Sequence, residues 1–127
     1  MRDNAFDLRV VRGGHDAGDG SLLSAAIRMK DARRIRASLF GAGLFAEPSW
    51  DILLEVYIAQ EDRRSLLAAD ICVDINAGWS SVMRWIRVLR SEGLIEGYPA
   101  LPISENTPIT LSRKGDEKMV AYLSITH

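Results

Sequence analysis

The sequence predicts a mainly helical α+β domain, with four helices, then two short strands, then a last helix. Three observations support this order. Apolar residues recur at a spacing of three and four in several stretches between residues 21 and 91, which is typical of helices. Glycine, proline and asparagine separate these stretches, as expected at helix ends and turns. After Gly93, short apolar runs flank a loop rich in proline and polar residues, which favours strands.

Length and composition fit one folded domain. The chain has 127 residues, of which 47% are hydrophobic and 26% are charged. No apolar run is long enough to cross a membrane, and residues 1–20 lack the apolar centre of a secretory signal. The single cysteine, Cys72, suits a reducing compartment. We therefore expect a cytoplasmic protein with no membrane partner.

No pattern in the sequence argues for an enzyme, a metal or a cofactor. A phosphate-binding glycine loop followed by lysine, a nucleophile elbow and metal-ligand spacings are all missing. His15 and His127 lie far from Cys72, which we interpret as a packing residue rather than a redox sensor. We expect a binding protein without a cofactor.

Positive charge is concentrated in two places, although the net charge is only −1. Five cations and one acid lie between Arg28 and Arg36, and three arginines without an acid lie between Arg84 and Arg90. Nucleic-acid binding depends on where cations sit rather than on their total, so the net charge does not exclude a local basic surface.

The N-terminal half is interpreted as a tail and two helices. Residues 1–20 are rich in glycine and predict a flexible tail, and residues 21–127 form the domain, with its core at 48–112. Ser21 is placed to cap a helix that runs to about residue 40 and stops at "GAG", residues 41–43. Pro48 suits the first turn of a second helix, which ends near residue 60.

The middle of the chain predicts two helices joined by a turn. Ser65 is a candidate cap for a short helix ending near Cys72. In the following "VDINAG", Asn76 is the best candidate for a left-handed backbone conformation. A fourth helix is expected from about Trp79 to Ser91, and Gly93 ends it.

The C-terminal part predicts strands and a final helix. "LIEGY" and "PITL" are expected to form two short strands around a loop at residues 99–107. Ser112 is placed to cap a last helix at about residues 113–124. Helices followed by a two-stranded wing give the winged helix-turn-helix arrangement, here with an N-terminal helix and a short C-terminal helix.

The fourth helix has two distinct faces. Val82, Ile86 and Leu89 share the face that should pack on the preceding helices. The major groove admits one helix, whose first turns reach the base edges. We therefore expect the other face to contact DNA. Arg84 would bind a base or a phosphate, and Arg87 and Arg90 would bind backbone phosphates. The expected DNA-binding residues are Ser80, Ser81, Arg84, Arg87 and Arg90. The alternative is an ordinary solvated helix face.

Two motifs resemble the MarR (multiple antibiotic resistance regulator) family. They are "MRWIRVLRSEGLIE" and "ITLSRKGDEKM", with Leu111, Ser112, Lys114 and Gly115 at the family's junction between wing and helix. The resemblance spans Trp50 to Leu123. It implies a transcriptional regulator that binds double-stranded DNA as a homodimer and responds in many relatives to a small-molecule effector.

Two departures from the family pattern affect these expectations. Residues 97–112 contain no Lys or Arg, so the wing cannot make the basic contact that family wings usually make. The last helix is also short, so dimerisation would depend mostly on the first helix. We expect the dimer interface at Leu23, Ile27, Ile35, Leu39, Met119 and Leu123. The uncharged wing also leaves open an alternative function, a winged-helix adaptor that binds proteins and does not read DNA sequence.

Overall fold

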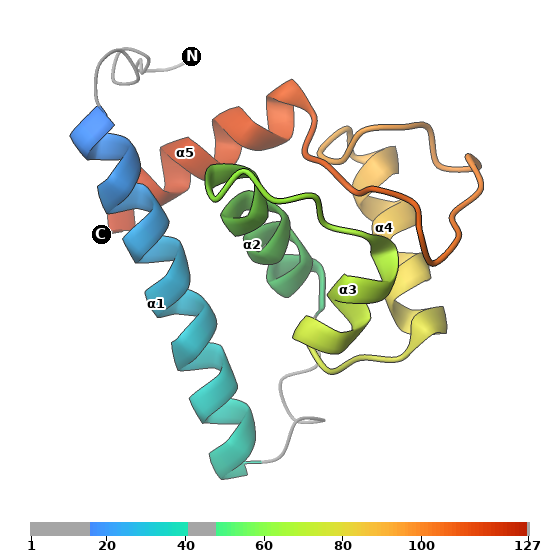
Figure 1. The fold of residues 1–127 in the computed structure, drawn as a ribbon, viewed down its shortest axis with the longest axis horizontal. Helices are drawn as coiled ribbons and strands as arrows, with labels where there is room; N and C mark the ends of the chain where they lie inside the picture. The colour runs from blue at the N-terminus through green and yellow to red at the C-terminus, as the bar shows by residue number, and fades with distance from the viewer. Residues whose placement is uncertain (1–15, 41–47, 127) are drawn as a thin grey trace.

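The computed structural model describes residues 16–40 and 48–126, and within them it forms five helices and no strand. The long helix α1 (Asp16–Phe40) lies along one side of the molecule (Figure 1). Next to it is α2 (Pro48–Glu61), which also contacts α3 (Ala68–Asp74) and α4 (Trp79–Ser91). The last helix, α5 (Arg113–Thr126), packs against both α1 and α2.

Helix α2 is the centre of the core. It begins at Pro48, as predicted, and its residues 54–59 are all buried. A helix that is buried on every side must be surrounded by other elements. Four helices meet this requirement by packing around α2.

Helix α1 begins earlier than predicted. It includes residues 16–20, which we expected in the tail, so Ser21 lies inside the helix and does not cap it. Leu22, Ala25 and Ala26 are buried and hold this part of the helix against the body. Once a helix is held in this way, each further residue adds to it at little cost. The rest of the expected tail and the "GAG" stop lie outside the described residues.

Helix α3 begins later than predicted, and Ser65 is not its cap. The helix starts at Ala68, and the Asp70 carboxylate accepts a hydrogen bond from the Leu67 amide at 2.9 Å. The preceding residues are held in an extended conformation by a distant segment. The Leu66 carbonyl accepts from the Ile109 amide at 2.8 Å, and the Ala68 amide donates to the Thr107 carbonyl at 2.9 Å.

Helix α4 matches the prediction. It spans Trp79–Ser91, and Asn76 in the preceding turn has a φ of 53°, in the left-handed region. Gly93 has a φ of 76°, and its amide donates to the Arg90 carbonyl, which closes the end of the helix. Asparagine and glycine tolerate this backbone region better than other residues, which is why both turns were visible in the sequence.

The two expected strands are not formed in the part of the chain that the structure describes. Two isolated antiparallel bridges replace them, Ile95 with Leu111 and Leu67 with Pro108. Pro108 has no amide hydrogen, so the pairing cannot continue through it. The Leu111 amide donates instead to the side chain of Gln60 at 2.7 Å. The fold is therefore mainly helical, and the expected wing is a loop tied at its base.

The turn after α4 and the start of α5 fit closely together. Ser112 caps α5, as predicted, because its Oγ accepts the Gly115 amide hydrogen at 2.9 Å. The same Oγ donates to the Gly93 carbonyl at 2.6 Å, and Lys114 Nζ donates to the Glu92 carbonyl at 3.1 Å. A Cβ at Gly115 would lie 2.1 Å from the Leu94 carbonyl oxygen, so only glycine fits there. The motifs "MRWIRVLRSEGLIE" and "ITLSRKGDEKM" thus form one packed unit.

Candidate nucleic-acid interface

Helix α4 presents a polar face away from the core. Its buried side packs on α2 and α3 through Val82, Met83, Ile86 and Leu89. On the other side Ser80, Arg84 and Arg87 are exposed, and Ser81 is half-buried. At a rise of 1.5 Å per residue, the exposed stripe from residue 80 to residue 87 is about 10 Å long.

Neither Arg84 nor Arg87 makes an ion pair with an acidic residue of the described chain. The Arg84 guanidinium lies 5.2 Å from the centre of the Trp85 ring, in a cation–π contact. Such a contact at an exposed site contributes only about 0.5–1 kcal/mol. Both guanidinium groups therefore remain available to an anionic partner.

Arg90 lies inside the protein, which corrects the prediction that it supports phosphate contacts. The residue is only 6% exposed. Its Nε donates to the Glu96 carbonyl at 3.0 Å and its Nη1 to the Leu101 carbonyl at 2.9 Å. Burial lowers the pKa of Arg90, and the charge of Arg87 lowers it further. Arg90 anchors the loop that follows α4, a role that spacing along the helix does not reveal.

That loop has no positive charge and exposes an aromatic ring. Tyr98 is 62% exposed near its start. Gly97, with a φ of 102°, lies against the Arg90 guanidinium. Further on, the Ser104 amide donates to Thr107 Oγ1 at 2.7 Å, and Glu105 is exposed. The loop is held by Arg90 at its base, and it is neutral to acidic at its surface.

The predicted dimer residues fall into two groups. Met119 and Leu123 are buried in the core of their own chain, so the prediction that they form an interface is wrong. They are buried because α5 packs on α1 and α2 within the chain. On α1, Leu23 is half-buried against the core, whereas Ile27, Ile35 and Leu39 are exposed.

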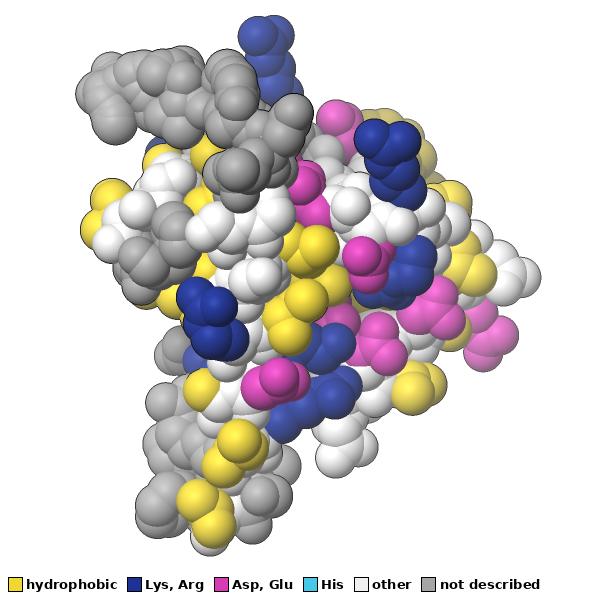
Figure 2. Space-filling view, turned by 60° about the vertical axis from the view of Figure 1, so that its left-hand side comes forward, with side chains coloured by type: hydrophobic (Ala, Val, Ile, Leu, Met, Phe, Trp, Pro, Cys, Tyr) yellow, Lys and Arg dark blue, Asp and Glu magenta, His cyan; other side chains and the backbone are white. Residues whose placement is uncertain are grey.

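The exposed apolar residues of α1 lie among charged side chains in the part of the surface that the structure describes (Figure 2). Ile35 is 59% exposed and Leu39 is 70% exposed. Figure 2 shows this side of the molecule, where groups of hydrophobic side chains alternate with charged ones. On α5, Tyr122 and Ile125 are also exposed, and the sequence analysis missed them. The register of α5 would have revealed them, because burial of residues 119, 120 and 123 turns 122 and 125 outward.

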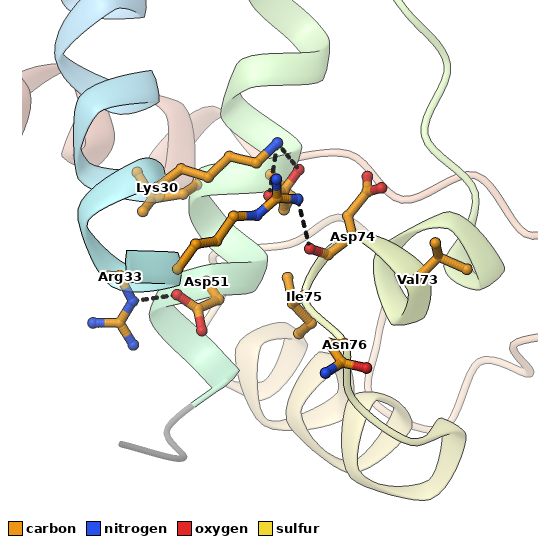
Figure 3. A pocket seen from close by; sticks show the side chains of 10 residues that line it. Lys30, Arg33, Asp51, Val73, Asp74, Ile75 and Asn76 are labelled. Atoms are coloured by element: carbon orange, nitrogen blue, oxygen red, sulfur yellow. Dashed lines mark hydrogen bonds and ion pairs between the residues drawn. The ribbon is translucent and has the colours of Figure 1, made fainter. Parts of the chain in front are cut away.

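A cleft of about 440 Å³ lies between α1, α2 and the turn after α3 (Figure 3). Within it Lys30 Nζ lies 3.2 Å and 3.1 Å from the two carboxylate oxygens of Glu55. Arg33 pairs with Asp51, and Arg34 Nη2 donates to the backbone carbonyl of Asp74 at 3.0 Å. The sequence showed the cations of α1 as a basic cluster, but it did not show their partners.

Three further observations concern the reactivity of Cys72, metal binding and membrane-spanning helices. Burial raises the pKa of the Cys72 thiol, which disfavours the reactive thiolate. In residues 16–40 and 48–126 no group of three His, Cys, Asp or Glu side chains could hold a metal ion. None of the helices in these ranges is both long and apolar enough to cross a bilayer.

Comparison of the chain with models of protein families, with curated proteins and with solved structures gave no match. The candidate interface therefore has to be judged on its own geometry and charge.

Proposed function

We propose that the chain is a sequence-specific, DNA-binding transcriptional regulator of the winged-helix class, related to the MarR family and active in the cytoplasm. The observation that supports this most is the exposed stripe of Ser80, Arg84 and Arg87 on α4. Its length of about 10 Å suits the major groove, which is about 12 Å wide.

The elements around α4 support the same function. Helices α3 and α4 are joined by a short turn at residues 75–78, as in helix-turn-helix proteins. The loop after α4 returns to pair with the segment before α3, through the bridge between Leu67 and Pro108. In this proposal the loop acts as the wing beside the recognition helix.

The exposed residues of α4 have separate roles in this proposal. Arg84 leaves the Trp85 ring and donates two hydrogen bonds to a guanine or clamps a phosphate. Ser80 and Ser81, in the first turn of the helix, contact bases or nearby phosphates. Arg87 contacts the phosphate backbone, which positions the protein without selecting sequence.

A second copy of the chain completes the proposed regulator. The exposed residues Ile27, Ile35 and Leu39 of α1 form the proposed interface of a homodimer on a two-fold operator. The two α4 helices would then enter half-sites about one helical turn, or a multiple of it, apart. Response to a small-molecule effector, which the family resemblance implies, is part of this proposal.

The test is a selection from random-sequence double-stranded DNA with the purified full chain, followed by binding of the enriched sites across a salt series. The proposal expects a palindromic motif. Arg84→Ala should weaken specific binding by about 1–3 kcal/mol and relax the preference at one base position. Arg113→Ala is the matched control, since this arginine of α5 has a side chain that is 93% exposed.

Two results would contradict the proposal. One is the absence of any enriched sequence, with binding that disappears at physiological salt. The other is an equal loss of binding in Arg84→Ala and Arg113→Ala, because a general electrostatic effect would then explain both.

A protein-binding adaptor is the second candidate function. Trp79 and Val88 on α4 are exposed, and so is Tyr98 in the loop that has no positive charge. Apolar side chains of this kind suit a protein partner. For an adaptor, Trp79→Ala and Tyr98→Ala should abolish partner binding, and no DNA motif should be enriched.

A further inference from the structure

The cleft between α1, α2 and the turn after α3 is lined by equal numbers of opposite charges. Three cations (Lys30, Arg33 and Arg34) face three acids (Asp51, Glu55 and Asp74). Two ion pairs, Lys30 with Glu55 and Arg33 with Asp51, account for four of these six residues. Arg34 and Asp74 are left without an ion pair within the described chain.

The buried pair at the base of the cleft has a structural role. Glu55 is 2% exposed and Lys30 holds both of its oxygens, which joins α1 to α2. A buried carboxylate needs such a partner, since an unpaired charge in the interior is costly. This pair explains Lys30 and Glu55. It does not explain why an arginine and an aspartate face the same cleft.

Arg34 and Asp74 come from opposite walls. Arg34 lies on α1, and Asp74 is the last residue of α3. Arg34 donates one hydrogen bond to the Asp74 backbone carbonyl at 3.0 Å, and a guanidinium has five N–H donors in all. Figure 3 shows Lys30 and Asp74 on facing sides of the cleft. A cation and an anion are thus presented to the same space.

The charges of the lining select against simple ions. A ligand with only a negative charge would meet Glu55 and Asp74, and one with only a positive charge would meet Lys30 and Arg34. A ligand with both charges, a few ångströms apart, can satisfy Arg34 and Asp74 together. Val73 and Ile75 add apolar surface for its body, and the volume of about 440 Å³ lies within the range of small-molecule sites.

We propose that this cleft binds a zwitterionic small molecule of the free amino-acid class. The ligand carboxylate accepts hydrogen bonds from the Arg34 guanidinium, and the ligand ammonium pairs with the Asp74 carboxylate. The side chain of the ligand lies against Val73 and Ile75. Binding depends on the cleft alone and not on the function proposed for α4.

One consequence concerns regulation and rests on that proposed function. The ligand carboxylate binds donors of the Arg34 guanidinium that the Asp74 carbonyl does not use. Binding therefore joins α1, through the ligand, to the turn that leads into α4, and in a DNA-binding protein it restricts the position of the recognition helix.

The test uses the full chain without DNA. The twenty common L-amino acids are titrated by calorimetry, with amide shifts of residues 73–76 followed by NMR. At least one should bind saturably with a dissociation constant of about 1 mM or lower. Arg34→Gln and Asp74→Asn should each weaken this binding about tenfold or more, because each removes a charged hydrogen-bond partner. Arg113→Gln, checked like the others for an unchanged circular dichroism spectrum, should bind normally.

Three outcomes would overturn the proposal: no amino acid binds, the N-acetyl and amide derivatives bind as well as the free amino acid, or Arg34→Gln binds unchanged. Binding of an amino acid by a chain that selects no DNA sequence would support the site and contradict the proposed function. Binding to both, with no effect of one on the other, would overturn the regulatory consequence.

Discussion

The two groups of cations that stand out in the sequence have different surroundings in the structure. On α1, Lys30 and Arg33 are paired with acids of α2, and Arg34 is bonded to the end of α3. On α4, Arg84 and Arg87 are exposed and have no acidic partner in the described chain. Charge density along the sequence is similar in the two places, so it does not show which cations hold the fold together.

The difference comes from what lies opposite each helix. The acids Asp51 and Glu55 are four residues apart on α2, and their partners Arg33 and Lys30 are three residues apart on α1, so each pair of residues shares one face of its helix. No described element covers the outer face of α4. Some cations hold helices together and others can bind a partner. The two kinds can therefore be told apart only when the residues around each cation are known.

The largest expected effect is a difference in stability between variants of two arginines of α4 that lie three residues apart. Arg90→Ala leaves two carbonyl groups without their charged donor, so the free energy of unfolding should fall by about 2–4 kcal/mol. Arg87→Ala should change it by less than about 0.5 kcal/mol, because the residue is exposed. Urea denaturation of both variants measures the difference. Equal stabilities would show that Arg90 is not an internal anchor.

The contact between Arg90 and Gly97 can be tested from the other side. Gly97→Ala places a Cβ 2.9 Å from Arg90 Nε at a φ of 102°, and we expect a loss of about 1–3 kcal/mol in stability. Gly20→Ala is the control, since a Cβ there meets nothing within 4 Å. Because Gly20 lies inside a helix, its replacement should stabilise by about 0.5–1 kcal/mol. Thermal unfolding followed by circular dichroism would reveal opposite signs.

A smaller effect is expected in the salt dependence of DNA binding, where a cation without an acidic partner should differ from a paired one. If Arg87 contacts a phosphate, Arg87→Ala should reduce the slope of log affinity against log salt by about 1. Arg33→Ala should leave the slope unchanged, because Asp51 already neutralises that residue. Fluorescence anisotropy at several salt concentrations measures both slopes. A fall in both would mean that the α1 cations also face DNA.

The smallest effect is the pH dependence of stability caused by Glu55. Burial raises the pKa of Glu55 above its ordinary value of 4.5, and Lys30 only partly opposes this. Above pH 4.5 the unfolded chain releases this proton before the folded chain does. Stability should therefore fall as pH rises from 4.5 to the higher folded-state pKa, and remain constant above it. Glu55→Gln should remove this part of the pH dependence in urea denaturation at several pH values, and an unchanged profile would contradict it.

Helix positions that depend on local chemistry were predictable from the sequence. Pro48, Asn76, Gly93 and Ser112 each have a backbone or capping property that acts within a few residues, and the structure has the turns and helix ends that they predict. The start of α3 was not predictable in this way, because it depends on hydrogen bonds to Thr107 and Ile109, some forty residues away.

The candidate site could be predicted only in part. The periodicity of α4 identified its exposed stripe, since buried and exposed positions alternate with the helical period. Arg90 was misplaced because a long side chain can bend back to a loop that the helical pattern does not include. Met119 and Leu123 were misplaced for a related reason, because apolar spacing shows that a helix face is covered but not which chain covers it.

The segment at residues 107–112 has a consequence for the order of folding. It joins Leu66, Gln60 and Leu94, all of which precede it by many residues. The ribosome makes this segment after α2, α3 and α4 are complete, so these helices emerge before their backbone partners exist. We expect the nascent chain to stay open until this segment has left the exit tunnel, since contacts between distant residues form late and close large loops. A chain stalled before Pro108 should therefore be cut readily by protease, and one released after α5 should resist it.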